Sequence, residues 1–143
     1  MKKRVFFCIM TLLLVMFITL SVFSGCQNFR RFFYDFDELK ATVERIDIVY
    51  VRPDDSIEFI KTVEGEEMQE VLCRLSKFEF FYHGGIPITI AEAIRLFYTN
   101  GNIEIIGEGA HRIYDNTGAQ IGGGGRAVVE VREWRAWINS FRE

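Results

Sequence analysis

The chain is poor in the residues that build metal sites. Among its 143 residues there are two histidines, three cysteines and two prolines. A catalytic zinc ion needs three protein ligands and an open position. His83 and His111 lie far apart in the sequence, with no HExxH or CxxC motif near either of them. Ordinary histidines in a loop or at a strand end explain both, so we expect no metal and no cofactor.

The cysteines are equally few, and their positions exclude an internal disulfide. Cys8 lies in an apolar leader, Cys26 ends that leader, and Cys73 is the one that remains. A thiol nucleophile needs a lowered pKa and an oriented base. Acidic residues precede Cys73 within a predicted helix, which disfavours the thiolate. The sequence therefore predicts no catalytic residue, and a hydrolase that uses Cys73 or a histidine is the rival hypothesis.

Excess positive charge is also missing from most of the chain. Three of the 17 basic side chains are Lys2, Lys3 and Arg4, so the chain from Cys26 onward has 14 basic and 20 acidic side chains. An acidic domain repels nucleic-acid phosphates. We therefore expect no nucleic-acid partner.

The N-terminal stretch has the features of an export signal. The basic cluster of Lys2, Lys3 and Arg4 is followed by residues 5–22, which carry no charge. The length of this run fits either a long secretory leader or a short membrane-spanning helix. Two small residues, Ser24 and Gly25, then precede Cys26 directly, as signal peptidases require.

The stretch "FSGC" resembles the lipobox of bacterial lipoproteins, although Phe23 stands where that family usually has Leu. The resemblance implies that residues 1–25 are a signal peptide and that a diacylglyceryl group on Cys26 anchors the mature chain. The lipid group would hold the mature chain at the outer face of the cytoplasmic membrane. A retained single span is the alternative, and both place the domain outside. The resemblance covers residues 1–26 and implies no activity.

Residues 26–42 are predicted to be a tether with an aromatic helix. Phe29, Phe32, Phe33, Phe36 and Leu39 recur at helical spacing within Gln27–Leu39, which predicts one apolar face. Two interpretations remain open. The helix packs on the domain, which is the commoner use of such a face, or it lies on the bilayer with Arg30 and Arg31 near lipid phosphates.

Residues 43–143 form the predicted domain. Alternation over residues 45–51 and 57–63, around turn residues at 52–56, predicts a hairpin. Residues 66–77 are expected to be a helix whose apolar stripe leaves Cys73 on the outer face. A second helix near the C-terminus should bury Trp134 and Trp137, because both share its apolar face.

Two further hairpins are predicted between these helices. Asn100 and Gly101 suit a two-residue turn, which would pair Tyr98 with Ile103 and Leu96 with Ile105 on one face. The stretch "HRIYDNTGAQI" predicts the next hairpin, and "RAVV" predicts a short last strand.

The fold class that follows is α+β. We expect a single antiparallel sheet of about five strands in the order ββαβββ(β)α, with two amphipathic helices on one face. A signal helix and the Phe-rich amphipathic helix would precede it. In element order the domain is similar to small uncharacterised lipoprotein domains of Gram-positive bacteria, a resemblance that implies no chemistry.

Two charged or flexible stretches invite a ligand hypothesis and do not meet its requirements. The glycines at 122–125 lack the Lys-Ser/Thr of a phosphate loop, and a flexible connection or a bulged strand end explains them. The glutamates at 64–70 lack the spacing of a calcium loop. The sequence therefore favours a non-enzymatic binding or interaction module with an unknown protein or small-molecule partner. A small enzyme or a structural envelope protein is the alternative.

Overall fold

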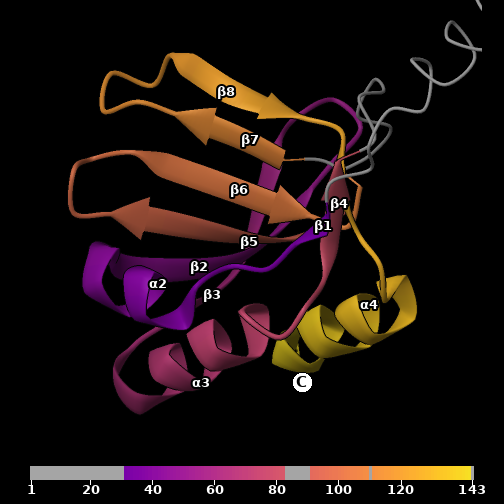
Figure 1. Cartoon of the computed structure of the whole chain (residues 1–143). Helices are drawn as coiled ribbons and strands as arrows, with labels where there is room; N and C mark the ends of the chain where they lie inside the picture. Colours follow the sequence, from indigo (N-terminus) through magenta and orange to yellow (C-terminus); the bar gives the residue numbers. More distant parts are fainter. Residues whose placement is uncertain (1–30, 83–90, 110, 143) are drawn as a thin grey trace, which may run out of the picture.

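The computed structural model describes residues 31–82, 91–109 and 111–142. The predicted signal peptide, Cys26 and His83 lie outside these residues. In the described part the chain forms two antiparallel sheets and three α-helices (Figure 1). The α+β class is therefore confirmed, and the prediction of a single sheet of about five strands is wrong.

The larger sheet has six strands in the order β3-β2-β5-β6-β7-β8. Their bounds are β2 Val43–Val51, β3 Ile57–Val63, β5 Ala91–Tyr98, β6 Ile103–Gly107, β7 His111–Tyr114 and β8 Gln120–Gly124. The smaller sheet has the order β1-β4-β9, with bounds β1 Arg31–Phe32, β4 Phe80–Tyr82 and β9 Arg126–Val128. The helices are α2 Phe36–Thr42, α3 Gly65–Leu75 and α4 Val131–Asn139, and a 3-10 turn η1 follows over Ser140–Arg142.

The smaller sheet brings together three short segments that are far apart in the sequence. Phe80 pairs with Phe32 on one side and with Val128 on the other. Strands of two or three residues are too short to show an alternating pattern, so neither β1 nor β4 was predicted. The predicted last strand "RAVV" does exist as β9, but it pairs in this sheet and not in the larger one.

From Arg31 to Asp35 the Phe-rich segment is not the helix that its spacing predicts, and residues 27–30, with Phe29, lie outside the described residues. In the described part, exposure alternates from Arg31 to Phe36, with the even-numbered side chains turned inward. The helix begins only at Phe36, because the Asp35 carboxylate caps it by accepting a hydrogen bond from the backbone N–H of Glu38 at 2.8 Å. Phe32 and Phe36, which are four residues apart, share a face in a strand as well as in a helix, so their spacing could not distinguish the two.

The segment nevertheless packs on the domain, as the first of the two interpretations had it. Phe32 stacks on Phe80 with ring centroids 5.6 Å apart, and Phe36 also contacts the core. Phe33 is the exception, because 57% of it is exposed.

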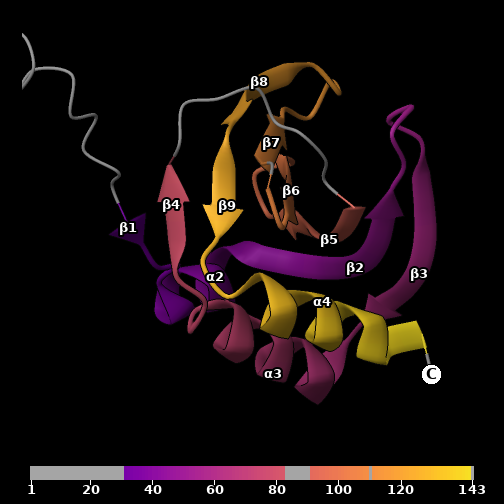
Figure 2. The same ribbon diagram turned by 90° about the vertical axis from the view of Figure 1, so that its right-hand side faces the viewer.

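The main core lies between the larger sheet, the smaller sheet and the helices, on the side of the larger sheet that the helices cover. Figure 2 shows that β2 and β3 curl away from α3 and α4, so the larger sheet has a concave side and a convex side that the helices cover. Trp134 and Trp137 are buried on the convex side, with Phe78 against both rings. This confirms the predicted apolar faces of both helices.

The β5–β6 hairpin exists, but its register differs by one residue from the prediction. The turn has three residues instead of two: Tyr98 N donates to Asn102 O at 2.9 Å, and Gly101 takes a left-handed conformation with φ of 86°. Ile103 therefore pairs with Phe97 and not with Tyr98. A shift of one residue moves each side chain of β6 to the opposite face. Glu104 consequently points to the convex side and Ile105 to the concave side.

Gly122, Gly123 and Gly124 form the end of β8, close to an irregularity in its pairing with β7, so the strand-end explanation of the glycine run applies to them. Gly123 pairs with Arg112 of β7 and has φ of 129°. A Cβ atom at this position would lie 2.3 Å from the carbonyl oxygen of His111. Glycine is needed here because the two backbones approach so closely. The predicted β7–β8 hairpin is thus confirmed, with an irregular register after Ile113.

Candidate functional site

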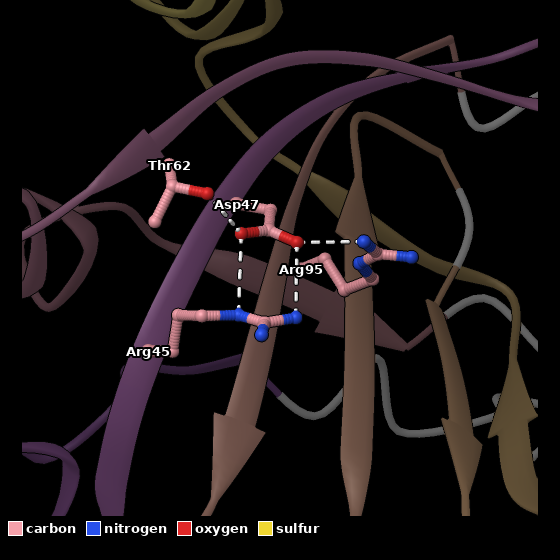
Figure 3. A network of polar contacts seen from close by, with 4 residues as sticks. All are labelled: Arg45, Asp47, Thr62 and Arg95. Carbon is pink, nitrogen blue, oxygen red and sulfur yellow. Dashed lines mark hydrogen bonds and ion pairs between the residues drawn. The ribbon is translucent and has the colours of Figure 1, made fainter.

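One polar cluster lies on the concave side of the larger sheet. We call it the arginine cluster and define it by Arg45, Asp47, Thr62 and Arg95 (Figure 3). Asp47 of β2 pairs with Thr62 of β3 on one side and with Arg95 of β5 on the other, and Arg45 is two residues before Asp47. Cross-strand partners and residues two apart share a face of a sheet. The strand pairing alone therefore brings the four side chains together.

Asp47 is the centre of this cluster. Its side chain is only 3% exposed, and its carboxylate accepts hydrogen bonds from Arg95 Nη2 at 2.6 Å and from Thr62 Oγ1 at 2.8 Å. Arg45 is held less closely, with Nε and Nη2 each 3.4 Å from a carboxylate oxygen. A buried carboxylate is tolerated when charged and hydrogen-bonding partners surround it, which is the case here.

The two arginines also share an aromatic neighbour. Phe97 pairs with Arg45 across β2 and β5. The guanidinium carbons of Arg45 and Arg95 lie 3.7 Å and 4.9 Å from the centre of its ring. The side chains remain partly exposed, 49% for Arg45 and 24% for Arg95. The result is a pair of cations that are ordered by contacts and still accessible to solvent.

The rest of the concave side is apolar, with one more arginine. A small buried cluster of Val49, Val51, Ala93 and Ile105 lies there, and Tyr114 packs against it. Arg112 of β7 donates from Nη2 to Asp55 at 2.7 Å. Asp55 belongs to the β2–β3 turn, so this ion pair joins that turn to β7.

A second polar cluster lies on the opposite, convex side of the same sheet. We call it the Glu104 cluster. Tyr34 donates to Glu104 Oε1 at 2.6 Å, Tyr98 donates to Oε2, and Nε2 of His111 also contacts Oε1. Glu104 is 6% exposed and His111 is 1% exposed. The cluster joins three strands to the segment before α2.

Its surroundings keep the Glu104 carboxyl ionised. Burial alone would raise the pKa of Glu104, but the hydrogen bond and charge of His111 lower it, and Tyr34 and Tyr98 lower it further. The pKa consequently lies below its usual value of 4.5. Glu104, Tyr34 and Tyr98 also line a cavity of about 320 Å³ together with Asp35 and Glu38. Both carboxylate oxygens are already hydrogen-bonded by the protein itself, which suits a structural role.

Cys73 and His111 are not brought together. Cys73 is partly exposed beside Gln69 and Lys77 on the outer face of α3, as the sequence predicts, and the hollow it lines contains no histidine in the described part of the chain. His111 contacts Glu104 instead. Within residues 31–82, 91–109 and 111–142, no three His, Cys, Asp or Glu side chains are grouped as metal ligands.

Sequence reasoning missed both polar clusters. The alternation in "RIDI" predicts that Arg45 and Asp47 share a face opposite Ile46 and Ile48, and this signal was available. Arg95 could join them only once the β2–β5 register was known. The register error in the β5–β6 hairpin had placed Glu104 on the opposite face from Leu96, whereas the two residues are paired.

Comparisons with known proteins found no relative of this chain. No protein-family model matches it, no curated protein matches it, and no solved structure matches it.

Proposed function

We propose that the chain is a lipid-anchored domain at the outer face of the cytoplasmic membrane, and that it binds a ligand or partner without catalysing a reaction. The observation that supports binding is the arginine cluster. Arg45 and Arg95 are ordered by Asp47 and Phe97, yet both keep accessible surface. Polar groups that are held in place before a ligand arrives are typical of binding sites, because less freedom is lost on binding.

The support for the anchor comes from the sequence of residues 1–26. Only residues 27–30 lie between Cys26 and β1. Even fully extended, such a link spans roughly 18 Å. An acylated Cys26 would therefore hold the domain close to the bilayer, with the exposed Phe33 near the point of attachment. Two acyl chains give a stable anchor, whereas a single chain does not.

None of the helices in the described ranges is long and apolar enough to cross a membrane.

Metabolic labelling with a fatty acid tests the anchor. The wild-type chain should take up label and sediment with membranes, whereas Cys26→Ala should lose the label and accumulate as a precursor of higher mass. Cys73→Ala is the matched control, because it removes a thiol from the domain and should keep full labelling. Equal labelling of Cys26→Ala and the wild type would refute the lipoprotein proposal.

A further inference from the structure

We propose that the arginine cluster is a site for an oxyanion, either a carboxylate or a phosphate group of a small ligand, which the guanidinium groups of Arg45 and Arg95 bind over the ring of Phe97. This inference rests on the proposed binding function and names the class of ligand that the site accepts.

The first argument is a surplus of positive charge. Two guanidinium groups, which are always protonated, face a single carboxylate. Asp47 therefore neutralises only half of the charge that surrounds it. The domain as a whole is acidic, so a cationic site on its surface requires a specific explanation. A bound oxyanion would complete the charge balance.

The second argument is a surplus of hydrogen-bond donors. Each guanidinium group has five N–H donors, and the Asp47 carboxylate, which also accepts from Thr62, cannot satisfy the donors of both arginines. Arg95 Nε is buried and has no hydrogen-bond partner in the structure. Arg45 makes only long contacts of 3.4 Å to Asp47, so little is lost if it turns to a better acceptor. Carboxylate and phosphate oxygens are the acceptors that match the planar fork of arginine.

The third argument concerns the neighbouring surface. Phe59 of β3 pairs with Val49, two residues after Asp47 on the same side of the sheet, and 57% of Phe59 is exposed. Ile57 follows on that side and is 41% exposed. An anionic group at the arginines would therefore have an apolar surface beside it. We infer that the ligand has an apolar part next to its oxyanion.

The experiment is an NMR titration of the full chain in a neutral detergent, observing the arginine Nε–Hε resonances. Inorganic phosphate and acetate are the two probes, each added at constant ionic strength against a chloride reference. We expect saturable shifts of the Arg45 and Arg95 resonances. Saturation by one probe alone assigns the site to that anion, and saturation by both supports the shared oxyanion chemistry. No saturable shift with either probe would overturn the proposal.

Two variants and a matched control locate the site. Arg45→Gln and Arg95→Gln should each weaken the binding of the saturating probe about tenfold, which corresponds to about 1.4 kcal/mol. Arg52→Gln makes the same change of charge at an exposed arginine paired with Glu58, and it should leave the affinity nearly unchanged. An equal loss in Arg52→Gln would show that the anion responds to net charge, and would refute the site.

A third variant, Arg45→Lys, keeps the test valid if Arg45→Gln does not fold. Arg45→Lys keeps the charge and loses the planar fork, so it should bind more weakly than the wild type and more tightly than Arg45→Gln. Wild-type affinity in Arg45→Lys and Arg45→Gln alike would contradict the proposed contact. The titration uses purified protein, so its result does not depend on whether Cys26 is acylated. Failure of the anchor and failure of the anion site are thus separate outcomes.

Discussion

Asp47 and Glu104 are both buried carboxylates of the same sheet, and they lie on opposite faces of it. Asp47 is 2% exposed and Glu104 is 6% exposed. Their partners differ. Glu104 accepts hydrogen bonds from two tyrosine hydroxyls and contacts a fully buried histidine. Asp47 is paired with two arginines whose side chains remain partly in solvent.

This difference indicates that Glu104 stabilises the fold, whereas Asp47 orders two arginines at the surface. If Glu104 is removed, Tyr34, Tyr98 and His111 each lose an acceptor, and the side chain of His111 is fully buried. If Asp47 is removed, its arginines can still be hydrated. Equal burial of two carboxylates therefore does not imply an equal contribution to stability, since the accessibility of their partners decides it.

The largest effect is expected for Glu104→Ala. Removing Glu104 takes an acceptor from His111, Tyr34 and Tyr98, and each buried polar group that is left unsatisfied costs about 1–3 kcal/mol. Urea unfolding followed by circular dichroism measures the change. Glu58→Ala is the control, because Glu58 forms an exposed pair with Arg52 and its loss should hardly move the midpoint. A similar midpoint for both variants would show that the Glu104 cluster is not structural.

The next effect is the pH dependence of the same cluster. The pKa of Glu104 is lowered in the folded state from its usual 4.5. The stabilisation is therefore fully present above that pH and is lost as the pH falls through the lower folded-state value. Glu104→Gln cannot titrate, so the difference in unfolding free energy between the wild type and this variant should shrink below about pH 4.5. A constant difference from pH 7 to pH 3 would contradict the lowered pKa.

A smaller effect is expected for Gly101→Ala, which tests the conformation of the turn between β5 and β6. Gly101 has φ of 86°, and an added Cβ atom would lie 2.9 Å from Cβ of Asn116. Left-handed backbone costs a non-glycine residue roughly 1–2 kcal/mol. Gly118→Ala is the matched control, since Gly118 has φ of 85° and open space around it. Unfolding should show a greater loss of stability for Gly101→Ala than for Gly118→Ala, and an equal loss would contradict the close approach of Gly101 to Asn116.

Local sequence patterns predicted much of the fold. The alternation in β2 and β3, the apolar stripe of α3 and the paired tryptophans of α4 each repeat over enough residues to show their period. The segment before α2 has no such regularity, because Phe32 and Phe36 share a face in a strand as well as in a helix. The strands β1 and β4 were not predicted, for a different reason. They are short, and each is stabilised by partners that are distant in the sequence.

The two polar clusters show the same limit. "RIDI" indicates that Arg45 and Asp47 point away from the apolar face of β2, and this could have been stated beforehand. The contact with Arg95 depends on pairing between β2 and β5, which are separated in the sequence by β3, α3 and β4. The face of the sheet on which Glu104 lies depends on a single extra residue in the β5–β6 turn. Long-range register decides both clusters, and local patterns do not contain it.

A crossed comparison of Glu104→Gln and Arg45→Gln tests the central claim most directly, by measuring the unfolding free energy and the phosphate affinity of both variants. Glu104→Gln should lower the unfolding free energy by about 1–3 kcal/mol and leave the phosphate affinity unchanged. Arg45→Gln should weaken phosphate binding about tenfold and change the unfolding free energy by about 1 kcal/mol or less. If Glu104→Gln weakens phosphate binding as much as Arg45→Gln does, then the distinction drawn between Glu104, which stabilises the fold, and Asp47, which orders the binding arginines, is wrong.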